Sequence, residues 1–88
     1  MIKTFVKKPV KVQAVQWTGD NYEEIADFVG GIRSVYQLND EYIVISYQTL
    51  KGDHCLRNGD WIIREVNGDI HRCDPYIFDK VYEEVTHD

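Results

Sequence analysis

No stretch of this 88-residue sequence is long and apolar enough to cross a membrane. A transmembrane helix needs about 18 or more consecutive apolar residues, and charged residues break up every apolar run here before that length. The first five residues, Met-Ile-Lys-Thr-Phe, also lack the hydrophobic central region of a signal peptide. We therefore expect no membrane attachment, and we expect the chain to stay in the compartment where it is made.

The signatures of nucleotide-binding and hydrolytic enzymes are missing as well. The sequence contains no Walker motif, no dinucleotide-binding fingerprint and no nucleophile elbow. Its net charge of −5 opposes non-specific binding to nucleic acid. Positive charge is concentrated near the start, at Lys3, Lys7, Lys8 and Lys11. These lysines indicate an edge strand protected against pairing with other chains, with a phosphate-contacting arm as the alternative.

Cysteine is scarce, since the chain has only Cys55 and Cys73, each close to a histidine, His54 and His71. Such a group can suggest zinc, but adjacent residues of a strand point to opposite faces, so His54 and Cys55 cannot both join the other pair. Three ligands and a water would make a catalytic rather than a structural zinc site. A Cys73–His71 nucleophile and base would lack an orienting third group. We expect no metal, no cofactor and no catalytic residue.

What the sequence does contain is enough apolar surface for one folded domain over residues 1–88. Hydrophobic residues make up 43% of the chain and aromatic residues 12%, so disorder is expected only at the ends. A chain of this length lies near the lower limit for a self-sufficient core. We therefore expect modest stability as a monomer, or support from a homo-oligomer interface.

A strand pattern and then a helix pattern occupy the first third of the chain. Residues 10–17 alternate as a strand does. Asp20 is predicted as the N-cap of a helix that ends at Gly30-Gly31. The apolar stripe of this helix comprises Tyr22, Ile25, Ala26 and Val29.

The remaining sequence predicts further strands and a second helix. The strands are expected over residues 34–38, 42–50, 53–57, 61–66 and 69–73, the last two joined by a type I′ turn at Asn67-Gly68. Asp74 and Pro75 begin a C-terminal helix whose buried stripe would be Ile77, Phe78, Val81 and Tyr82. The predicted fold class is α+β: a curved antiparallel sheet of four to five strands, or a small open barrel, with one helix after the first strand and a short C-terminal helix.

Two segments carry a resemblance to a known family. Residues 12–21 contain Gln-Trp-Thr-Gly-Asp, and residues 59–83 contain Gly-Asp-Trp-Ile-Ile, then Cys-Asp-Pro-Tyr-Ile-Phe and Tyr-Glu. On these motifs the chain resembles small accessory proteins of tailed bacteriophages and prophages. His71 and Arg72 depart from the family pattern, which has an aromatic residue and a proline there. The resemblance implies the cytoplasm of a bacterial host, where reducing conditions favour free thiols, so we expect no disulfide.

The candidate contact residues are aromatic side chains and arginines, the residue types that dominate binding hot spots. They are Trp17, Trp61, Arg64, Arg72 and Tyr76. Both tryptophans lie beside turns, and core packing is the alternative for each. The Asn67-Gly68 turn predicts Arg64 opposite His71 and Ile62 opposite Cys73. The other face of this hairpin would then carry Trp61, Ile63, Ile70 and Arg72.

These observations favour a non-enzymatic binding module, a phage or prophage accessory protein that contacts a host or phage macromolecule. Its partner would be another protein or a second copy, with a homo-oligomer expected. One alternative is an oligomeric binder of a small nucleotide signal in anti-defence, since a single chain of this size rarely encloses a pocket of about 300 Å³. The second alternative is a small metalloprotein or enzyme using Cys73 and His71.

Overall fold

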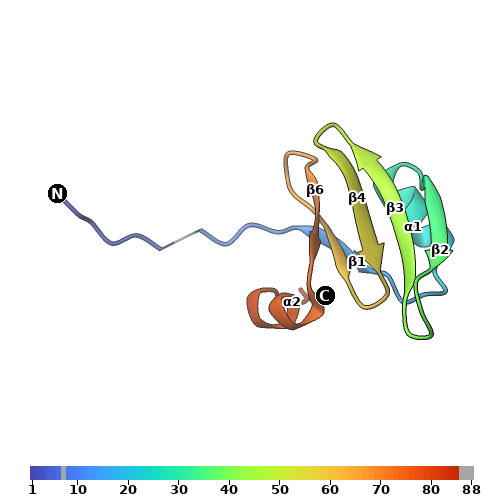
Figure 1. Cartoon of the computed structure of the whole chain (residues 1–88). Coiled ribbons are helices and arrows are strands. Elements are labelled where there is room, and N and C mark those ends of the chain that lie inside the picture. Colours follow the sequence, from blue (N-terminus) through green and yellow to red (C-terminus); the bar gives the residue numbers. More distant parts are fainter. Residues whose placement is uncertain (7, 86–88) are drawn as a thin grey trace.

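The computed structural model describes residues 1–6 and 8–85, and within them the chain forms six strands and two helices (Figure 1). The strands are β1 (Gln13–Gln16), β2 (Ser34–Gln37), β3 (Ile43–Thr49), β4 (Gly52–Arg57), β5 (Trp61–Arg64) and β6 (Ile70–Cys73). The helices are α1 (Tyr22–Val29), which follows β1, and α2 (Pro75–Val81), which follows β6. No helix in the described part of the chain is long and apolar enough to span a membrane.

The strands form two three-stranded antiparallel sheets, in the orders β1–β5–β6 and β2–β3–β4. The predicted α+β class, the antiparallel pairing and the positions of both helices are confirmed. The strands do not form one continuous sheet, however, because the series of hairpins is interrupted between β4 and β5. Neither sheet closes into a barrel.

The interruption occurs at the turn of residues 57–60. The Asp60 N–H donates to the Arg57 carbonyl at 3.0 Å and reverses the chain. This turn then pairs with the residue that follows β1, because the Trp17 N–H donates to the Asp60 carbonyl at 2.9 Å. In return, the Gly59 N–H donates to the Trp17 carbonyl at 2.6 Å. As a result β5 continues alongside β1 rather than beside β4.

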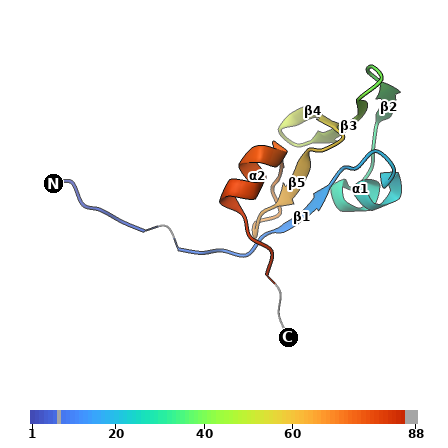
Figure 2. The same cartoon turned by 90° about the horizontal axis from the view of Figure 1, so that it is seen from below.

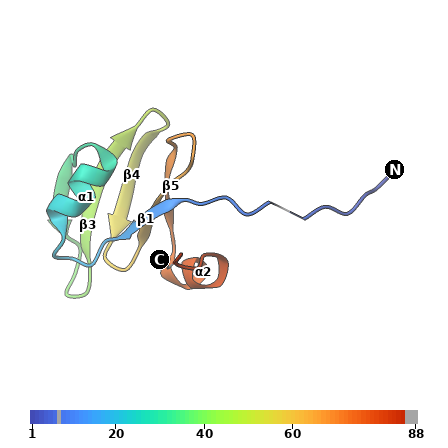
Figure 3. The same cartoon turned by 180° about the vertical axis from the view of Figure 1, so that it is seen from behind.

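The core lies where the two sheets meet α1. It consists of Trp17, Ile25, Ile45, Tyr47, Leu56 and Ile62, which come from α1, from both sheets and from the link after β1. Figure 3 shows α1 alongside β3 and β1, where it covers this core from one side. Because both sheets contribute side chains, burial of the core holds them together.

Helix α1 begins one residue later than predicted, at Tyr22 with Asn21 as its cap residue. The predicted cap, Asp20, is wrong, because its carboxylate accepts a hydrogen bond from the Thr18 hydroxyl at 2.6 Å instead. Asn21 accepts a hydrogen bond from the Thr18 N–H at 2.9 Å and donates to the Gln16 carbonyl at 2.8 Å, which fixes the link from β1. At the other end, the predicted glycine cap is confirmed.

The segment before β1 is an extended arm, residues 1–6 and 8–12, which have neither helix nor strand (Figures 1 and 2). The predicted strand over residues 10–17 is therefore shorter, at Gln13–Gln16. The last pair along β5 is Gln13 with Arg64, and the chain then enters the loop to β6. The described residues before Gln13 consequently have no neighbouring strand to pair with.

The lysines near the start of the chain therefore do not protect an edge strand. Lys3, Lys8 and Lys11 lie on the arm, and Lys7 lies outside the described residues. The arm runs away from the two sheets in Figure 1. The alternative of a phosphate-contacting arm stays a prediction.

The hairpin of β5 and β6 turns at Asn67-Gly68 as predicted, but its loop type and register differ. The Gly68 N–H donates to the Glu65 carbonyl at 2.9 Å, and the Glu65 N–H donates to the Asp69 carbonyl at 2.8 Å. Gly68 has a positive φ of 92°, whereas Asn67 does not have a positive φ. The turn is therefore not type I′, which requires positive φ at both central residues. It is a loop over residues 66–68 with one left-handed glycine.

This loop shifts the pairing of the hairpin by one residue. Trp61 lies opposite Cys73 and Arg64 opposite Ile70, so the predicted pairs of Arg64 with His71 and of Ile62 with Cys73 are wrong. A shift of one residue moves each side chain of a strand to the other face relative to its partner strand. Trp61 and Ile63 share their face with His71 and Cys73, and Ile62 and Arg64 share theirs with Ile70 and Arg72.

We expect Gly68→Val to lower the free energy of unfolding by about 1–2 kcal/mol, because a left-handed backbone is strained for a residue with a Cβ. No atom lies within 4 Å of the position that a Cβ would take, so the loss would come from the backbone alone. Urea denaturation followed by circular dichroism would measure it. Gly68→Asn should lose less, since asparagine tolerates this conformation, and so should Lys51→Val. Equal stability of all three variants would contradict the left-handed turn.

Candidate functional site

Trp17 is a core residue and not a surface contact. It is 2% exposed, and its indole Nε1–H donates to the Ile43 carbonyl at 2.9 Å. Trp17 therefore packs in the core of the folded chain and is not available as a contact residue on the surface. Its role is to tie the link after β1 to β3.

Arg64 is engaged within the chain. Its guanidinium donates to the Phe28 carbonyl at 2.6 Å and to the Gln13 Oε1 at 2.9 Å. The same group lies 4.1 Å from the centre of the Phe28 ring, a cation–π contact. Arg64 thus fastens the C-terminal end of α1 to the β1–β5–β6 sheet.

Arg72 neutralises a buried acid. Its Nη1 lies 3.6 Å from the Asp60 carboxylate, whose side chain is 7% exposed. A buried carboxylate is costly without a partner of opposite charge. Asp60 also accepts a hydrogen bond from the Arg57 N–H at 3.2 Å. Arg72 is therefore held at the turn between the two sheets, on the opposite face of the hairpin from Trp61.

Helix α2 packs on the side chain of Trp61. The Trp61 and Phe78 rings are stacked almost parallel, with centroids 3.9 Å apart and an angle of 3°. Tyr82 continues the stack, with its ring 5.0 Å from that of Phe78. Burial within this stack raises the pKa of the Tyr82 hydroxyl above its ordinary value. These three rings form the attachment of α2 to the β1–β5–β6 sheet.

The rest of the predicted apolar stripe of α2 is uncovered. Ile77 is 56% exposed and Val81 65% exposed, so the prediction that both are buried is wrong. The seven-residue helix packs on one ring at the end of a short strand, and a helix can present only one side to such a support. Tyr76, the remaining candidate contact residue, is 80% exposed on the same helix. Of the five candidates, Trp61 supports α2 and Tyr76 is exposed on it, whereas Arg72 lies at the same end of the hairpin on the opposite face.

We call the uncovered set the α2 surface. It comprises Tyr76, Ile77, Val81 and Val85, all of them exposed. The sequence analysis missed Ile77 and Val81 as contact residues, because it assigned them to the core. The width of the apolar stripe is the signal that could have found them: it spans two neighbouring rows of side chains, and the end of one short hairpin covers only one row.

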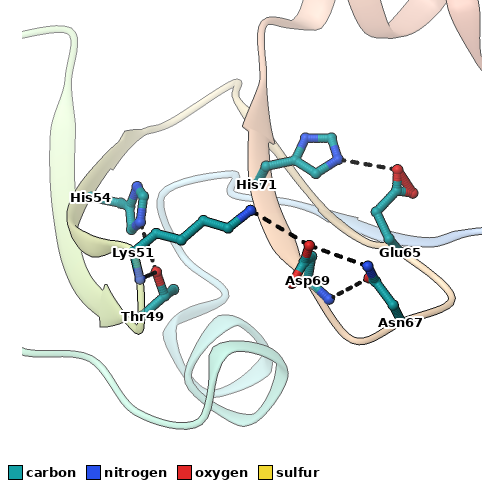
Figure 4. Close-up of polar contacts among 7 residues, drawn as sticks. All are labelled: Thr49, Lys51, His54, Glu65, Asn67, Asp69 and His71. Carbon is teal, nitrogen blue, oxygen red and sulfur yellow. Dashed lines mark hydrogen bonds and ion pairs between the residues drawn. The ribbon is translucent and has the colours of Figure 1, made fainter.

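A groove of about 630 Å³ lies between the tips of the β3–β4 hairpin and the β5–β6 hairpin. It is lined by Val10, Lys51, Glu65, Val66, Asn67, Asp69, Ile70 and His71. Figure 4 shows two contacts along it: the Lys51 Nζ lies 3.5 Å from the Asp69 carboxylate, and the His71 Nε2 lies 3.5 Å from that of Glu65. Sequence reasoning missed this groove because its walls come from turns far apart in the chain.

The histidine and cysteine side chains do not converge. His54 forms a hydrogen bond of 2.9 Å with the Thr49 hydroxyl (Figure 4) and stacks on the Tyr47 ring, whereas His71 faces Glu65. Both cysteines are free thiols. Within the described residues, no three histidine, cysteine or acidic side chains are grouped to hold a metal ion.

Cys73 is a poorly activated thiol in this structure. Its Sγ–H donates to the Asp74 carbonyl at 3.5 Å. Partial burial, reinforced by the negative charges of Asp74 and Asp60, raises the pKa of the Cys73 thiol above its ordinary value of 9.0. A nucleophilic cysteine needs the opposite shift, because the thiolate is the reactive form.

We expect the alkylation rate of Cys73 to keep rising beyond pH 9.0, since a raised pKa delays formation of the thiolate. Iodoacetamide labelling of the Cys55→Ser variant across a pH series, followed by mass spectrometry, would measure the rate at Cys73 alone. A rate that levels off below pH 9.0 would show instead that the thiol is activated.

Comparison of the chain with known protein families, with curated proteins and with solved structures finds no match in any of the three.

Proposed function

We propose that this chain is a non-enzymatic binding module that contacts a protein partner through the α2 surface. One observation carries the proposal: α2 has a broad apolar stripe, and the chain covers the side of it that holds Phe78 but leaves Ile77 and Val81 exposed. Ile77 and Val81 lie one helical turn apart and therefore adjoin on the same side of α2, and exposed apolar patches on a small domain are typical of protein contact sites. Tyr76 supplies at the edge of this surface an aromatic side chain of the kind that hot spots favour.

The energetics of α2 support a partner. A fully buried Ile or Val side chain gains roughly 1.5–3 kcal/mol, and more than half of Ile77 and Val81 is still accessible. An isolated helix of this length is marginal in water, so α2 depends on its contacts. It has one aromatic stack and an N-terminal cap, in which Asp74 accepts from the Tyr76 N–H at 2.8 Å. A partner on the α2 surface would stabilise the helix from its open side.

The proposed setting is that of a phage or prophage accessory protein in the cytoplasm of a bacterial host, with a host or phage protein as partner. Support comes from the residues that carry the family resemblance. The Gly-Asp-Trp-Ile-Ile motif contains Trp61, and the Pro-Tyr-Ile-Phe motif contains Ile77 and Phe78. The resemblance thus includes both the attachment of α2 and part of its uncovered surface.

A second candidate function is the binding of a small nucleotide in the groove between the hairpins. Its volume of about 630 Å³ lies within the roughly 300–1,000 Å³ of pockets for drug-sized ligands. The groove is open to solvent, however, so a single chain would leave much of such a ligand uncovered. Glu65 and Asp69 on the walls oppose it, since their carboxylates repel phosphate and occupy the nearby basic groups. The raised pKa of Cys73 likewise opposes an enzyme that uses Cys73 as a nucleophile.

Replacing Ile77 and Val81 together by serine tests the leading function. We expect association with a protein partner, or self-association measured by sedimentation velocity, to weaken by about tenfold or more, because the lost apolar contact exceeds 1.4 kcal/mol. The matched control is Val35→Ser with Leu38→Ser, which removes two apolar side chains of similar exposure, 43% and 53%, from the region of β2.

The proposal would be wrong if the α2 variant and the control associated equally well with every partner of the unmodified chain. Nucleotide binding would not depend on Ile77 and Val81, because neither residue lines the groove. Isothermal titration of the same two variants with cyclic nucleotides therefore separates the two candidate functions.

A further inference from the structure

The arm is a second uncovered apolar element. Ile2, Phe5 and Val6 are 99%, 82% and 90% exposed, and Val10 is exposed as well. These side chains lie on an extended segment that projects from the folded body in all three views (Figures 1, 2 and 3). A segment that stays in water is normally polar, whereas this arm exposes one aromatic and three aliphatic side chains. Its composition is that of a segment that packs against apolar surface.

The arm and the region of α2 carry opposite charges. Among residues 1–12 there are lysines and no acidic residue, and Lys3, Lys8 and Lys11 belong to the described part of the arm. Residues 74–85, which contain α2, carry four acidic residues, Asp74, Asp79, Glu83 and Glu84, and one basic residue, Lys80. An apolar, basic strand and an apolar, acidic helix complement each other in both hydrophobicity and charge.

Within one chain, the arm and α2 leave the β1–β5–β6 sheet from opposite ends. The arm departs from Gln13, which pairs with Arg64, whereas α2 follows Cys73, which pairs with Trp61 at the other end of β5. Pro9 fixes its own φ and disfavours the helical region for the residue before it, which keeps this part of the arm extended. Figures 1 and 3 show the arm and α2 on the same side of the sheets, with the start of the arm projecting beyond α2. To cover its own α2 the start of the arm would have to fold back on itself, whereas a second copy can present α2 to the arm as it stands.

We propose that the arm of one chain lies across the α2 surface of a second copy, and that the second copy's arm does the same in return. This inference rests on the proposed function, because it takes the α2 surface to be a contact surface and names its occupant. The apolar residues of the arm pack on Ile77 and Val81, and Lys3 and Lys8 face the carboxylates of the α2 region. Two equivalent contacts of this kind form a closed, two-fold symmetric dimer.

Length and size are consistent with this exchange. An extended chain covers about 3.3–3.6 Å per residue, so the arm reaches well beyond a helix of seven residues, which rises about 1.5 Å per residue. A domain of 88 residues has little core of its own, and oligomerisation is a common way for such a domain to gain apolar burial. The exchanged arms would provide that burial without altering either sheet.

A complementation experiment tests the exchange. The arm variant carries Phe5→Ser and Val6→Ser, and the α2 variant carries Ile77→Ser and Val81→Ser. Each variant alone has lost both contacts and should sediment as a monomer across the micromolar range, while the unmodified chain is a dimer. An equimolar mixture regains one intact contact, the arm of the α2 variant on the helix of the arm variant. We expect the mixture to form a heterodimer, at least about tenfold weaker than the unmodified dimer.

The partners in the contact can be identified directly. Carbodiimide cross-linking of mixed isotopically light and heavy chains should join arm lysines to acidic residues of the α2 region in light–heavy pairs. The arm variant serves also as the folding control, because substitutions outside the sheets should leave its circular dichroism spectrum unchanged. Val35→Ser with Leu38→Ser should remain a dimer.

Three results would overturn the exchange. One is an unmodified chain that is a monomer throughout this range, another is an arm variant that still forms the dimer, and the third is a mixture that stays monomeric. In each case the α2 surface could still bind a different protein, and the effect of the α2 variant on that binding would show it. If the α2 variant loses neither self-association nor any other partner, the proposed function itself fails.

Discussion

Trp17 joins the two sheets, because its backbone binds one part of the structure and its side chain another. Its N–H and carbonyl exchange hydrogen bonds of 2.9 and 2.6 Å with the turn at Gly59 and Asp60, which starts β5 beside β1. Its buried indole donates to the Ile43 carbonyl at 2.9 Å and packs in the core. Trp17 therefore both directs the chain after β4 to pair with β1 and fills the space between the two sheets.

The exposure of α2 follows from this division of the strands into two sheets. In a single sheet, a C-terminal helix could lie across several strands and bury a whole apolar stripe. Here the β5–β6 hairpin belongs to a three-stranded sheet with β1, and Phe78 of α2 stacks on Trp61 while Tyr82 stacks on Phe78. Ile77 and Val81 remain open to a partner, and the apolar, basic arm is the segment of the chain that best complements them.

Local features of the fold could be predicted from the sequence. Asp74 caps α2 with Pro75 in its first turn, and Gly30 ends α1 with a φ of 83°, because these residue types have strong backbone preferences. The register of the last hairpin could not be predicted from the sequence, because a left-handed Gly68 suits a loop over residues 66–68 as well as a type I′ turn. The division into two sheets depends on pairing with Trp17, which is distant in the sequence.

The candidate site was harder to predict for the same reason. Apolar periodicity shows that Ile77 and Val81 are hydrophobic, but only the sheet topology shows that nothing in the described chain covers them. Trp17 and Arg64 were chosen for their residue types, and both turned out to hold the fold together. Trp61 and Tyr76 belong to α2 or its support, whereas Arg72 lies at the same end of the hairpin on the opposite face.

The most direct test is whether the α2 surface is covered in solution. Methyl NMR spectra recorded with a soluble paramagnetic probe report the accessibility of Ile77 and Val81, and Val35 and Leu38 provide an internal reference, since all four are exposed in one chain. We expect the methyl signals of Ile77 and Val81 to be protected from broadening at concentrations where the chain associates, while those of Val35 and Leu38 broaden. Equal broadening of all four would contradict a contact on the α2 surface.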